Sequence, residues 1–378
     1  MFNGTPPRTV LLIATQQIGD VLLCTPLLKS MREAWPDAVI DVLVYRNTGG
    51  ILQGNTDCNG VIVTSNHPSL SAYFSLIKRI FRHYDLAVTT QGNDRAHQYA
   101  FLAAKKRVGL IPSLAAKHWW KKLICQRWSL LNEATNHTVV QNLLLADLMG
   151  IARNYALIPP KSTGSASKLN GLLNFSAVPY LVIHPLPMWQ YKRWLDANWQ
   201  ALITHACNLG FRVVITGGPD ASEQTYCAQL ANAFLNNGLV QNLAGNTSFA
   251  DMSALLSNAA AYVGPDTVTT HLAAACNTPT LALFGPTNPV KWAPWPFGYC
   301  KAVSPWQTYS PLYQRVNNVL LLQGLGACVP CHQAGCDKHN NSHSRCLDEL
   351  SVSRVIDALN VLLRQKIAQK TILISASS

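Results

Sequence analysis

The stretch with the densest candidate chemistry is Gly264-Pro265-Asp266-Thr267, followed one turn later by His271. A short apolar strand leads through the Gly-Pro turn into a helix opened by Asp266 and Thr267. The start of such a helix carries unpaired backbone N–H groups and the positive end of the helix dipole, which together bind phosphate. His271 stands four residues after Thr267, so both side chains can face one ligand. An ordinary N-cap beside a buried histidine fits the same residues, and the pattern alone leaves both interpretations open.

Further polar groups follow other strands of the second half of the chain. Because the carboxyl ends of parallel strands meet at one edge of a sheet, these groups are expected to lie together there. A basic pair, a Gly-Gly turn and the helix start above would suit a nucleotide diphosphate, with a glutamate to hold a ribose hydroxyl. The residues are Lys192, Arg193, Gly217, Gly218 and Glu223.

Asp20 is the candidate of the first half of the chain. It follows a buried strand expected at 9–15 and opens a helix expected at 21–33. Asp at this position is most often a plain N-cap. A carboxylate held at the mouth of a sheet is also available as a general base, so both roles stand.

The elements that must position these groups alternate between strand and helix. This order predicts an α/β fold with doubly wound parallel sheets. No GxGxxG follows the first strand, which argues against a nicotinamide or flavin site in this half. A linker rich in small residues is expected at 159–168. We therefore expect an N-terminal domain (1–165), a C-terminal domain (166–350), and a terminal helix and tail (351–378) whose helix packs against the body.

Composition limits the partners. The 378 residues carry a formal net charge of +12, which favours an anionic partner: nucleic acid, a phosphorylated small molecule or an anionic membrane surface. No apolar run approaches the roughly 18 residues of a membrane span. The apolar stretch at 10–14 is too short for a secretory signal, so a cytoplasmic protein is expected.

A basic, tryptophan-containing segment lies between residues 105 and 128. Such charge runs usually form a solvated face, but tryptophans among lysines also fit a membrane interface or a phosphorylated acceptor. The same mixture would suit single-stranded nucleic acid, yet the chain has no nucleic-acid-binding motif and nucleic acid is not the expected partner. The residues expected on this surface are Lys105, Lys106, Arg107, Lys121 and Lys122.

Three segments stand in a fixed order between residue 9 and about residue 295: Ile18-Gly19-Asp20-Val21-Leu22 with Thr25-Pro26-Leu27, Gly264-Pro265-Asp266-Thr267 with Thr270-His271-Leu272-Ala273-Ala274-Ala275, and Leu283-Phe284-Gly285-Pro286-Thr287 with Trp292-Ala293-Pro294. Together they resemble the motifs of glycosyltransferase family 9, the bacterial heptosyltransferases of lipopolysaccharide core assembly.

The resemblance implies a GT-B fold of two Rossmann-like domains facing a cleft, with the acceptor on the N-terminal half and ADP-heptose on the C-terminal half. It implies that Asp20 is the catalytic base, that Lys192 pairs with the donor phosphates, and that the reaction inverts the anomeric centre without a metal. The residues that the resemblance assigns to the donor are Lys192, Glu223, Thr247, Asp266, Thr267 and His271.

This chain departs from the family pattern after the Asp-Thr pair. The family usually has glycine there, where this chain has Val268. A β-branched side chain keeps the backbone further from a phosphate than glycine does, so the pose of the donor and the identity of its sugar stay open.

Four cysteines near the C-terminus follow the spacing C-x2-C-x4-C-x9-C. Two thiols at C-x2-C spacing can grip one tetrahedral metal and two more complete it, which predicts a structural zinc or iron site. The alternative is a reduced or partly disulfide-linked loop that only packs. Similar clusters occur in some relatives of the family, among them heptosyltransferases that modify autotransporter proteins, where the metal is structural iron. The cysteines are Cys328, Cys331, Cys336 and Cys346.

The leading hypothesis is therefore a heptosyltransferase acting on the lipopolysaccharide inner core, peripheral to the cytoplasmic face of the inner membrane of a Gram-negative bacterium. Its partners would be ADP-heptose, a phosphorylated lipid-linked core acceptor and the membrane surface. Transfer of heptose to a protein is the second hypothesis. A GT-B-like epimerase or a transferase of another nucleotide sugar, and a basic binding module without activity, are the others.

Overall fold

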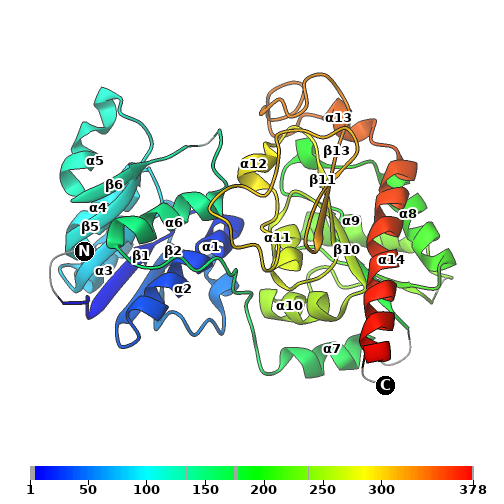
Figure 1. The fold of residues 1–378 in the computed structure, drawn as a ribbon, viewed down its shortest axis with the longest axis horizontal. Coiled ribbons are helices and arrows are strands. Elements are labelled where there is room, and N and C mark those ends of the chain that lie inside the picture. The colour runs from blue at the N-terminus through cyan, green and yellow to red at the C-terminus, as the bar shows by residue number, and fades with distance from the viewer. Residues whose placement is uncertain (1–4, 133, 174–177, 237, 377–378) are drawn as a thin grey trace. The chain divides into compact units, whose positions relative to one another are not determined.

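The computed structural model describes residues 5–132, 134–173, 178–236 and 238–376. The chain forms two compact units, one of residues 1–160 with 298–304 and the other of residues 161–297 with 305–378 (Figure 1). The linker expected at 159–168 spans the point where the chain passes from the first unit to the second. The return of residues 298–304 to the first unit was not predicted.

The first unit is built on a six-stranded sheet in the order β3-β2-β1-β4-β5-β6, with every neighbouring pair parallel. The chain lays down one side of the sheet from β1 to β3 and then crosses to β4, so the order reverses between β1 and β4. This reversal is the topological switch point of the unit. The strands are β1 (Thr9–Ile13), β2 (Val39–Tyr45), β3 (Gly60–Thr64), β4 (Tyr84–Thr89), β5 (Ala104–Ile111) and β6 (Arg127–Leu130).

The helices of the first unit connect these strands. They are α1 (Ile18–Leu23), α2 (Thr25–Ala34), the short 3-10 turn η1 (Gly49–Leu52), α3 (Leu70–Ile80), α4 (Asp94–Ala103), η2 (Ala116–His118), α5 (Trp119–Ile124) and α6 (Thr138–Met149).

The single helix expected at 21–33 is two helices, α1 and α2, divided at Cys24. Proline has no N–H to donate and disfavours a helical residue before it, so Pro26 marks the break. In an unbroken helix the N–H of residue 26 would bond to the carbonyl of Leu22. Thr25 Oγ1 donates to that carbonyl instead, at 2.8 Å.

The second unit has a seven-stranded sheet in the order β12-β13-β11-β10-β7-β8-β9. All neighbouring strands are parallel except the hairpin of β12 and β13 at one edge. The strands are β7 (Tyr180–Ile183), β8 (Arg212–Ile215), β9 (Val240–Asn242), β10 (Ala261–Pro265), β11 (Thr280–Phe284), β12 (Gln314–Val316) and β13 (Val319–Gln323).

The helices of the second unit complete the alternation. They are α7 (Ser165–Leu173), η3 (Gln190–Lys192), α8 (Asp196–Asn208), α9 (Ala221–Asn232), α10 (Phe249–Asn258), α11 (Val268–Ala275), α12 (Pro289–Trp292), α13 (Arg345–Asp348) and α14 (Val352–Ala376).

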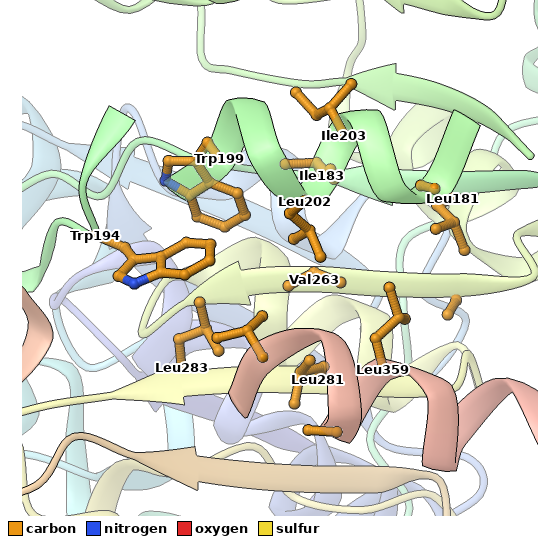
Figure 2. Packing of buried hydrophobic residues seen from close by; sticks show 14 of the residues in the cluster. Leu181, Ile183, Trp194, Trp199, Leu202, Ile203, Val263, Leu281, Leu283 and Leu359 are labelled. Atoms are coloured by element: carbon orange, nitrogen blue, oxygen red, sulfur yellow. The ribbon is translucent and has the colours of Figure 1, made fainter. Parts of the chain in front are cut away.

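The core of the second unit packs α8 and the terminal helix α14 against the central strands (Figure 2). Trp194 and Trp199 meet edge to face with ring centroids 4.9 Å apart, in the same cluster as Val263 of β10 and Leu281 and Leu283 of β11. Leu359 of α14 is fully buried in the same cluster. The expected docking of the terminal helix is therefore confirmed.

The fold class expected from the sequence, two α/β units with doubly wound parallel sheets, is confirmed. No helix within the described residues combines the length and apolar character needed to cross a bilayer.

Candidate active site

The start of α11 carries a salt bridge between two of the expected donor residues. Lys192, at the end of η3 after β7, places its Nζ 2.6 Å from Asp266 Oδ2, in the turn after the neighbouring strand β10. Both side chains are largely buried, at 18% and 10% exposure. A charged hydrogen bond of this length holds the ammonium group in place beside the helix start.

Thr267, and not Asp266, is the N-cap of α11. Its side chain accepts from the N–H of Thr270 at 3.4 Å, whereas Asp266 is turned to Lys192. The expectation that Asp266 and Thr267 together open the helix is thus refined: the threonine caps and the aspartate binds the cation. The helix start keeps its backbone donors and gains a fixed positive charge.

Tyr262 fixes the start of α11 to its strand. Its hydroxyl lies 2.9 Å from Thr270 Oγ1, which also donates to the carbonyl of Pro265. A Cβ at Gly264 would lie 2.1 Å from the Tyr262 hydroxyl, so only glycine leaves room for this side chain. The glycine of the Gly264-Pro265 turn is therefore explained by packing inside the unit.

His271 is buried and neutral. Burial lowers its pKa to about 4, and the nearby charges of Asp266 and Lys192 act in opposite directions on it. Its Nδ1 is buried and has no hydrogen-bond partner among the described residues. The buried histidine of the simpler interpretation is thus observed, together with a salt bridge that the simpler interpretation did not include.

Glu223 lies in the first turn of α9 and binds the turn after β8. Its Oε2 accepts from the N–H of Gly218 at 2.6 Å. A Cβ at Gly218 would lie 2.9 Å from that oxygen, so glycine is needed for the approach. Thr247, before α10, has a buried Oγ1 that lacks a hydrogen-bond partner among the described residues. Both polar groups follow strands of the second unit, as the sequence pattern predicts.

Two residues that the sequence analysis missed belong to the same unit. His184, directly after β7, places Nδ1 3.1 Å from Thr216 Oγ1, and burial lowers its pKa to about 4. Ser344 donates its hydroxyl to the carbonyl of Tyr191 at 2.6 Å, next to Lys192 in the chain. The sequence contained a signal for His184, namely its position at the end of a strand. It contained none for Ser344, because 153 residues separate Ser344 from its partner Tyr191.

Asp20 lies in the first turn of α1, just after β1, where the strand order of the first unit reverses. One turn on, Cys24 donates a long hydrogen bond to Thr90 Oγ1 at 3.6 Å. Burial raises the pKa of Cys24 to about 12, and the Asp20 carboxylate adds to that rise. Cys24 is thus a neutral thiol, and Asp20 stands at the switch point, where open α/β sheets bind ligands.

A polar side chain missed by the sequence analysis stands at the same switch point. Gln91, after β4, accepts at Oε1 from Thr15 Oγ1 at 3.1 Å and from Asn93 Nδ2 at 2.6 Å. The pair of bonds ties the ends of β1 and β4 together, which supports the backbone that precedes Asp20.

The basic segment expected on the surface is only partly exposed. Lys105 and Lys106 are exposed and Lys122 is half-buried. The expectation was wrong for Lys121 and Arg107. Lys121 is 1% exposed, donates to the Gly92 carbonyl at 2.5 Å and binds Asp94 at 2.7 Å.

Arg107 is buried because it bridges main-chain carbonyls. It donates to Ala104 and Ile124, both at 2.6 Å, from a strand position that faces the unit interior. Guanidinium groups satisfy several carbonyls at once, which offsets the cost of burying the charge.

The cysteine cluster does not form a metal site within the described chain. The thiols of Cys328, Cys331, Cys336 and Cys346 are free. Burial raises the pKa of Cys346 to about 12, and the other three cysteines, which lie nearby, add to this rise. Yet no group of three or more His, Cys, Asp or Glu among the described residues could hold a metal ion. The expected structural zinc or iron is therefore not supported.

The cysteine-rich segment instead braces two strand ends. The N–H of His332 donates to the Pro286 carbonyl after β11 at 2.9 Å. The Ser344 bond described above holds the turn that carries Lys192. The segment also packs against Gly324, directly after β13. A Cβ at Gly324 would lie 2.1 Å from the Cys346 carbonyl oxygen, so this position requires glycine.

Comparison with known proteins identifies the family to which this chain belongs. Residues 73–308, more than half of the chain, match glycosyltransferase family 9 (heptosyltransferase). The chain belongs to this family. It is a glycosyltransferase, as the sequence motifs implied.

Curated relatives cover most of this family 9 chain. It is 30% identical over 290 residues to "Lipopolysaccharide heptosyltransferase 3" of Escherichia coli, which covers 73% of this chain and 83% of the relative. It is 28% identical over 297 residues to "Lipopolysaccharide heptosyltransferase 1" of Pseudomonas aeruginosa, with 74% and 79% covered.

Solved structures of the family share the fold. The structure of E. coli ADP-heptose lps heptosyltransferase II matches with a TM-score of 0.70 and 21% identity, over 95% of this chain and 99% of that one. E. coli heptosyltransferase WaaC with ADP matches with a TM-score of 0.68 and 20% identity, over 94% and 99%. These heptosyltransferases have the GT-B fold, so the expected GT-B architecture of two Rossmann-like units is confirmed.

Proposed function

We propose that this family 9 glycosyltransferase is an inverting heptosyltransferase. It transfers heptose from ADP-heptose to the lipopolysaccharide inner core, peripheral to the cytoplasmic face of the inner membrane of a Gram-negative bacterium. The observation that carries the proposal is the buried Lys192–Asp266 pair at the start of α11. Relatives named for lipopolysaccharide heptosyl transfer, and related structures named with ADP and ADP-2-deoxy-2-fluoro heptose, support it.

The donor diphosphate binds at the start of α11. The Lys192 ammonium and the backbone N–H groups of the helix start compensate the phosphate charge, and Asp266 keeps the lysine in position. Thr267 and His271, from the start of the same helix, line the donor site, while Glu223 and Thr247 hold the nucleoside. As ADP leaves, the negative charge that develops on it meets a fixed cation, which lowers the barrier.

Asp20 acts as the general base. Its carboxylate takes the proton of the acceptor hydroxyl, and that oxygen attacks the anomeric carbon of heptose. The bond from this carbon to the ADP oxygen breaks on the opposite face, and ADP departs with the electron pair. The attack from behind inverts the anomeric centre. Lysine and helix charges balance the leaving group, so the mechanism assigns no step to a metal.

The acceptor binds the unit that carries Asp20. Its phosphates and lipid meet the basic side chains that the structure leaves accessible on that unit, Lys105, Lys106 and Lys122. Buried Lys121 and Arg107 take no part in this contact.

The test is release of ADP from ADP-heptose with and without a heptose-deficient lipopolysaccharide core. We expect acceptor-dependent release by the wild type and a fall of about 10²-fold or more in Asp20→Asn, with ADP-heptose binding retained. Asp37→Asn is the matched control, because Asp37 is an exposed carboxylate of the same unit, and it should behave as the wild type.

Three results would redirect the proposal. Release without any acceptor would indicate hydrolysis or epimerase-like chemistry. Binding of ADP-heptose without transfer to any core would favour a protein acceptor. Failure to bind ADP-heptose would disprove the proposed donor. The first residue to examine for a different sugar would then be Val268, which is half-buried at the first position of α11.

A further inference from the structure

Gln91, which two hydrogen bonds hold at the end of β4, uses only one half of its amide group within the described chain. Its Oε1 accepts from Thr15 Oγ1 at 3.1 Å and from Asn93 Nδ2 at 2.6 Å. Its Nε2 is buried and has no hydrogen-bond partner among the described residues. The whole side chain is 1% exposed. A buried donor without an acceptor costs free energy, so the position of this nitrogen calls for a reason.

The orientation of the Gln91 amide is fixed by its neighbour Asn93. Asn93 is the N-cap of α4, and its Oδ1 accepts from the N–H of Ala96 at 2.8 Å. The other end of the Asn93 amide is therefore Nδ2, which can only donate. The Gln91 atom 2.6 Å from it has to be the oxygen, because a nitrogen there would set two donors against each other. Turning the Gln91 amide over would thus break the bond from Asn93.

The turn that carries Gln91 is held rigidly. Thr89 Oγ1 accepts from the N–H of Gln91 at 3.3 Å, and buried Lys121 donates to the Gly92 carbonyl at 2.5 Å. A Cβ at Gly92 would lie 2.8 Å from Cδ of Pro112, so this position requires glycine. The fold therefore keeps the amide nitrogen in one place, which is what a group that orients a ligand needs.

Two contacts connect this turn to the segment that carries Asp20. Thr15 binds Gln91 directly, and Cys24 donates to Thr90 Oγ1 at 3.6 Å. Cys24 is the C-cap of α1 and follows Asp20 by four residues, so the two lie on the same side of the helix. The proposed base and the Gln91 amide therefore stand at the ends of the neighbouring strands β1 and β4.

The chain on either side of these contacts is accessible, although the Gln91 side chain is not. Residues 16–20, which follow Thr15, and residues 92–94, which follow Gln91, are half-buried or exposed. A molecule that binds against these two segments covers the switch point, where open α/β sheets bind ligands. An oxygen atom of that molecule can supply the acceptor that the described residues do not.

We infer that Gln91 binds the acceptor substrate: its Nε2 donates a hydrogen bond to a hydroxyl oxygen of the sugar that receives the heptose, next to the hydroxyl that Asp20 deprotonates. The inference rests on the proposed function, because it takes the acceptor to lie beside Asp20. A sugar held at two neighbouring oxygens presents one hydroxyl to the base in a fixed geometry. Gln91 thus helps to select the hydroxyl that is glycosylated.

The test is heptose transfer by the full chain to a delipidated, heptose-deficient core acceptor and to analogues that each lack one hydroxyl of the accepting sugar. For the wild type, one analogue that keeps the nucleophilic hydroxyl should show a kcat/KM about 10- to 100-fold lower, because it leaves Nε2 unpaired. Gln91→Glu keeps the oxygen that Thr15 and Asn93 bind and removes the N–H. In this variant the intact acceptor should fall to the level of that analogue, with KM for ADP-heptose unchanged.

The variant Gln91→Met separates the loss of the donor from the addition of a charge. Methionine has a similar length and no charge, so this variant should lose the same discrimination between the intact acceptor and the analogue. If only Gln91→Glu lost it, the cause would be the new carboxylate acting on Asp20, and the inference would be overturned.

Gln141→Glu is the matched control, because Gln141 is a buried glutamine of the same unit whose amide is bonded at both ends. Its Oε1 accepts from the N–H of Asn132 at 2.7 Å, and its Nε2 donates to the Leu130 carbonyl at 3.1 Å. This substitution should lower the temperature of unfolding and keep the wild-type discrimination among acceptors.

Two further results would be decisive. Wild-type discrimination in Gln91→Glu would overturn the inference alone and assign the amide nitrogen to a buried water or to packing. A wild type that transfers no heptose to any core acceptor would refute the proposed function, and the inference with it.

Discussion

Lys192 Nζ and Asp266 Oδ2 lie 2.6 Å apart although 74 residues separate them in the chain. The contact exists because β7 and β10 are neighbours in the sheet and the turns that follow them meet at the same edge. It places a fixed cation beside the start of α11, and the proposed binding of the donor diphosphate depends on this cation.

The variant Lys192→Met tests this pair. We expect kcat/KM for ADP-heptose to fall by about 10²-fold, since the leaving diphosphate loses its cation. Breaking the buried pair should also lower the free energy of unfolding by about 3 kcal/mol, because Asp266 keeps an uncompensated charge. ADP-release kinetics and urea unfolding measure the two effects.

A second variant separates the two effects. The double variant Lys192→Met/Asp266→Asn also removes the uncompensated charge of Asp266. It should recover most of the free energy of unfolding lost in Lys192→Met but none of the lost activity. Recovery of both would mean that Lys192 is needed only for folding.

The buried histidines predict a stability that depends on pH. His184 and His271 keep a pKa of about 4 in the folded chain, against about 6.5 when unfolded, so below pH 6.5 the unfolded state takes up protons that the folded state does not. The free energy of unfolding should therefore decrease as pH falls from 7 to 5, by about 2 kcal/mol for each histidine.

Urea unfolding of His184→Gln and His271→Gln at pH 7 and pH 5 measures this. Each variant should show a smaller loss on acidification than the wild type. His67→Gln is the control, because His67 is exposed, in the connection between β3 and α3, and its replacement should leave the slope unchanged. Identical slopes in all variants would contradict the neutral, buried state of the two histidines.

Ser344 predicts a link between the cysteine-rich segment and the donor. Ser344→Ala leaves the Tyr191 carbonyl without its 2.6 Å donor, and the turn that carries Lys192 should loosen. We expect KM for ADP-heptose to rise about fivefold with kcat little changed. Ser344→Thr should restore the wild-type KM, and Ser351→Ala, an exposed serine nearby in the chain, should have no effect. A loss confined to thermal stability would show that the bond does not position Lys192.

Neighbouring lysines of α5 predict opposite outcomes. Lys121→Met loses the bonds to the Gly92 carbonyl and to Asp94, and should destabilise the chain by about 1–3 kcal/mol. Most of this comes from the carbonyl, because Asp94 is largely exposed and its ion pair is screened. Lys122→Met should be within about 0.5 kcal/mol of the wild type. Equal effects in urea unfolding would contradict the buried position of Lys121.

Much of the fold was predictable because its signals are local. Apolar runs ending in Gly, Pro or Asp mark strands and turns, and their alternation with helices implies parallel sheets. The exception at residues 21–33 was local too: Pro26 divides the helix, and the sequence contained that signal. The family motifs add an order of segments that composition alone does not provide.

The sequence by itself determined the two α/β halves, the family, and the positions of Asp20, Glu223 and the α11 start at strand ends, since these follow from the chain's own neighbours. Only the tertiary structure decided that Thr267 caps while Asp266 binds Lys192, that Lys121 turns inward and Lys122 does not, and that the four thiols do not form a metal-holding group among the described residues. The physical reason is that burial and ionic partners depend on contacts between residues distant in the chain, and a charged side chain has the same sequence signature whether it faces water or a carbonyl.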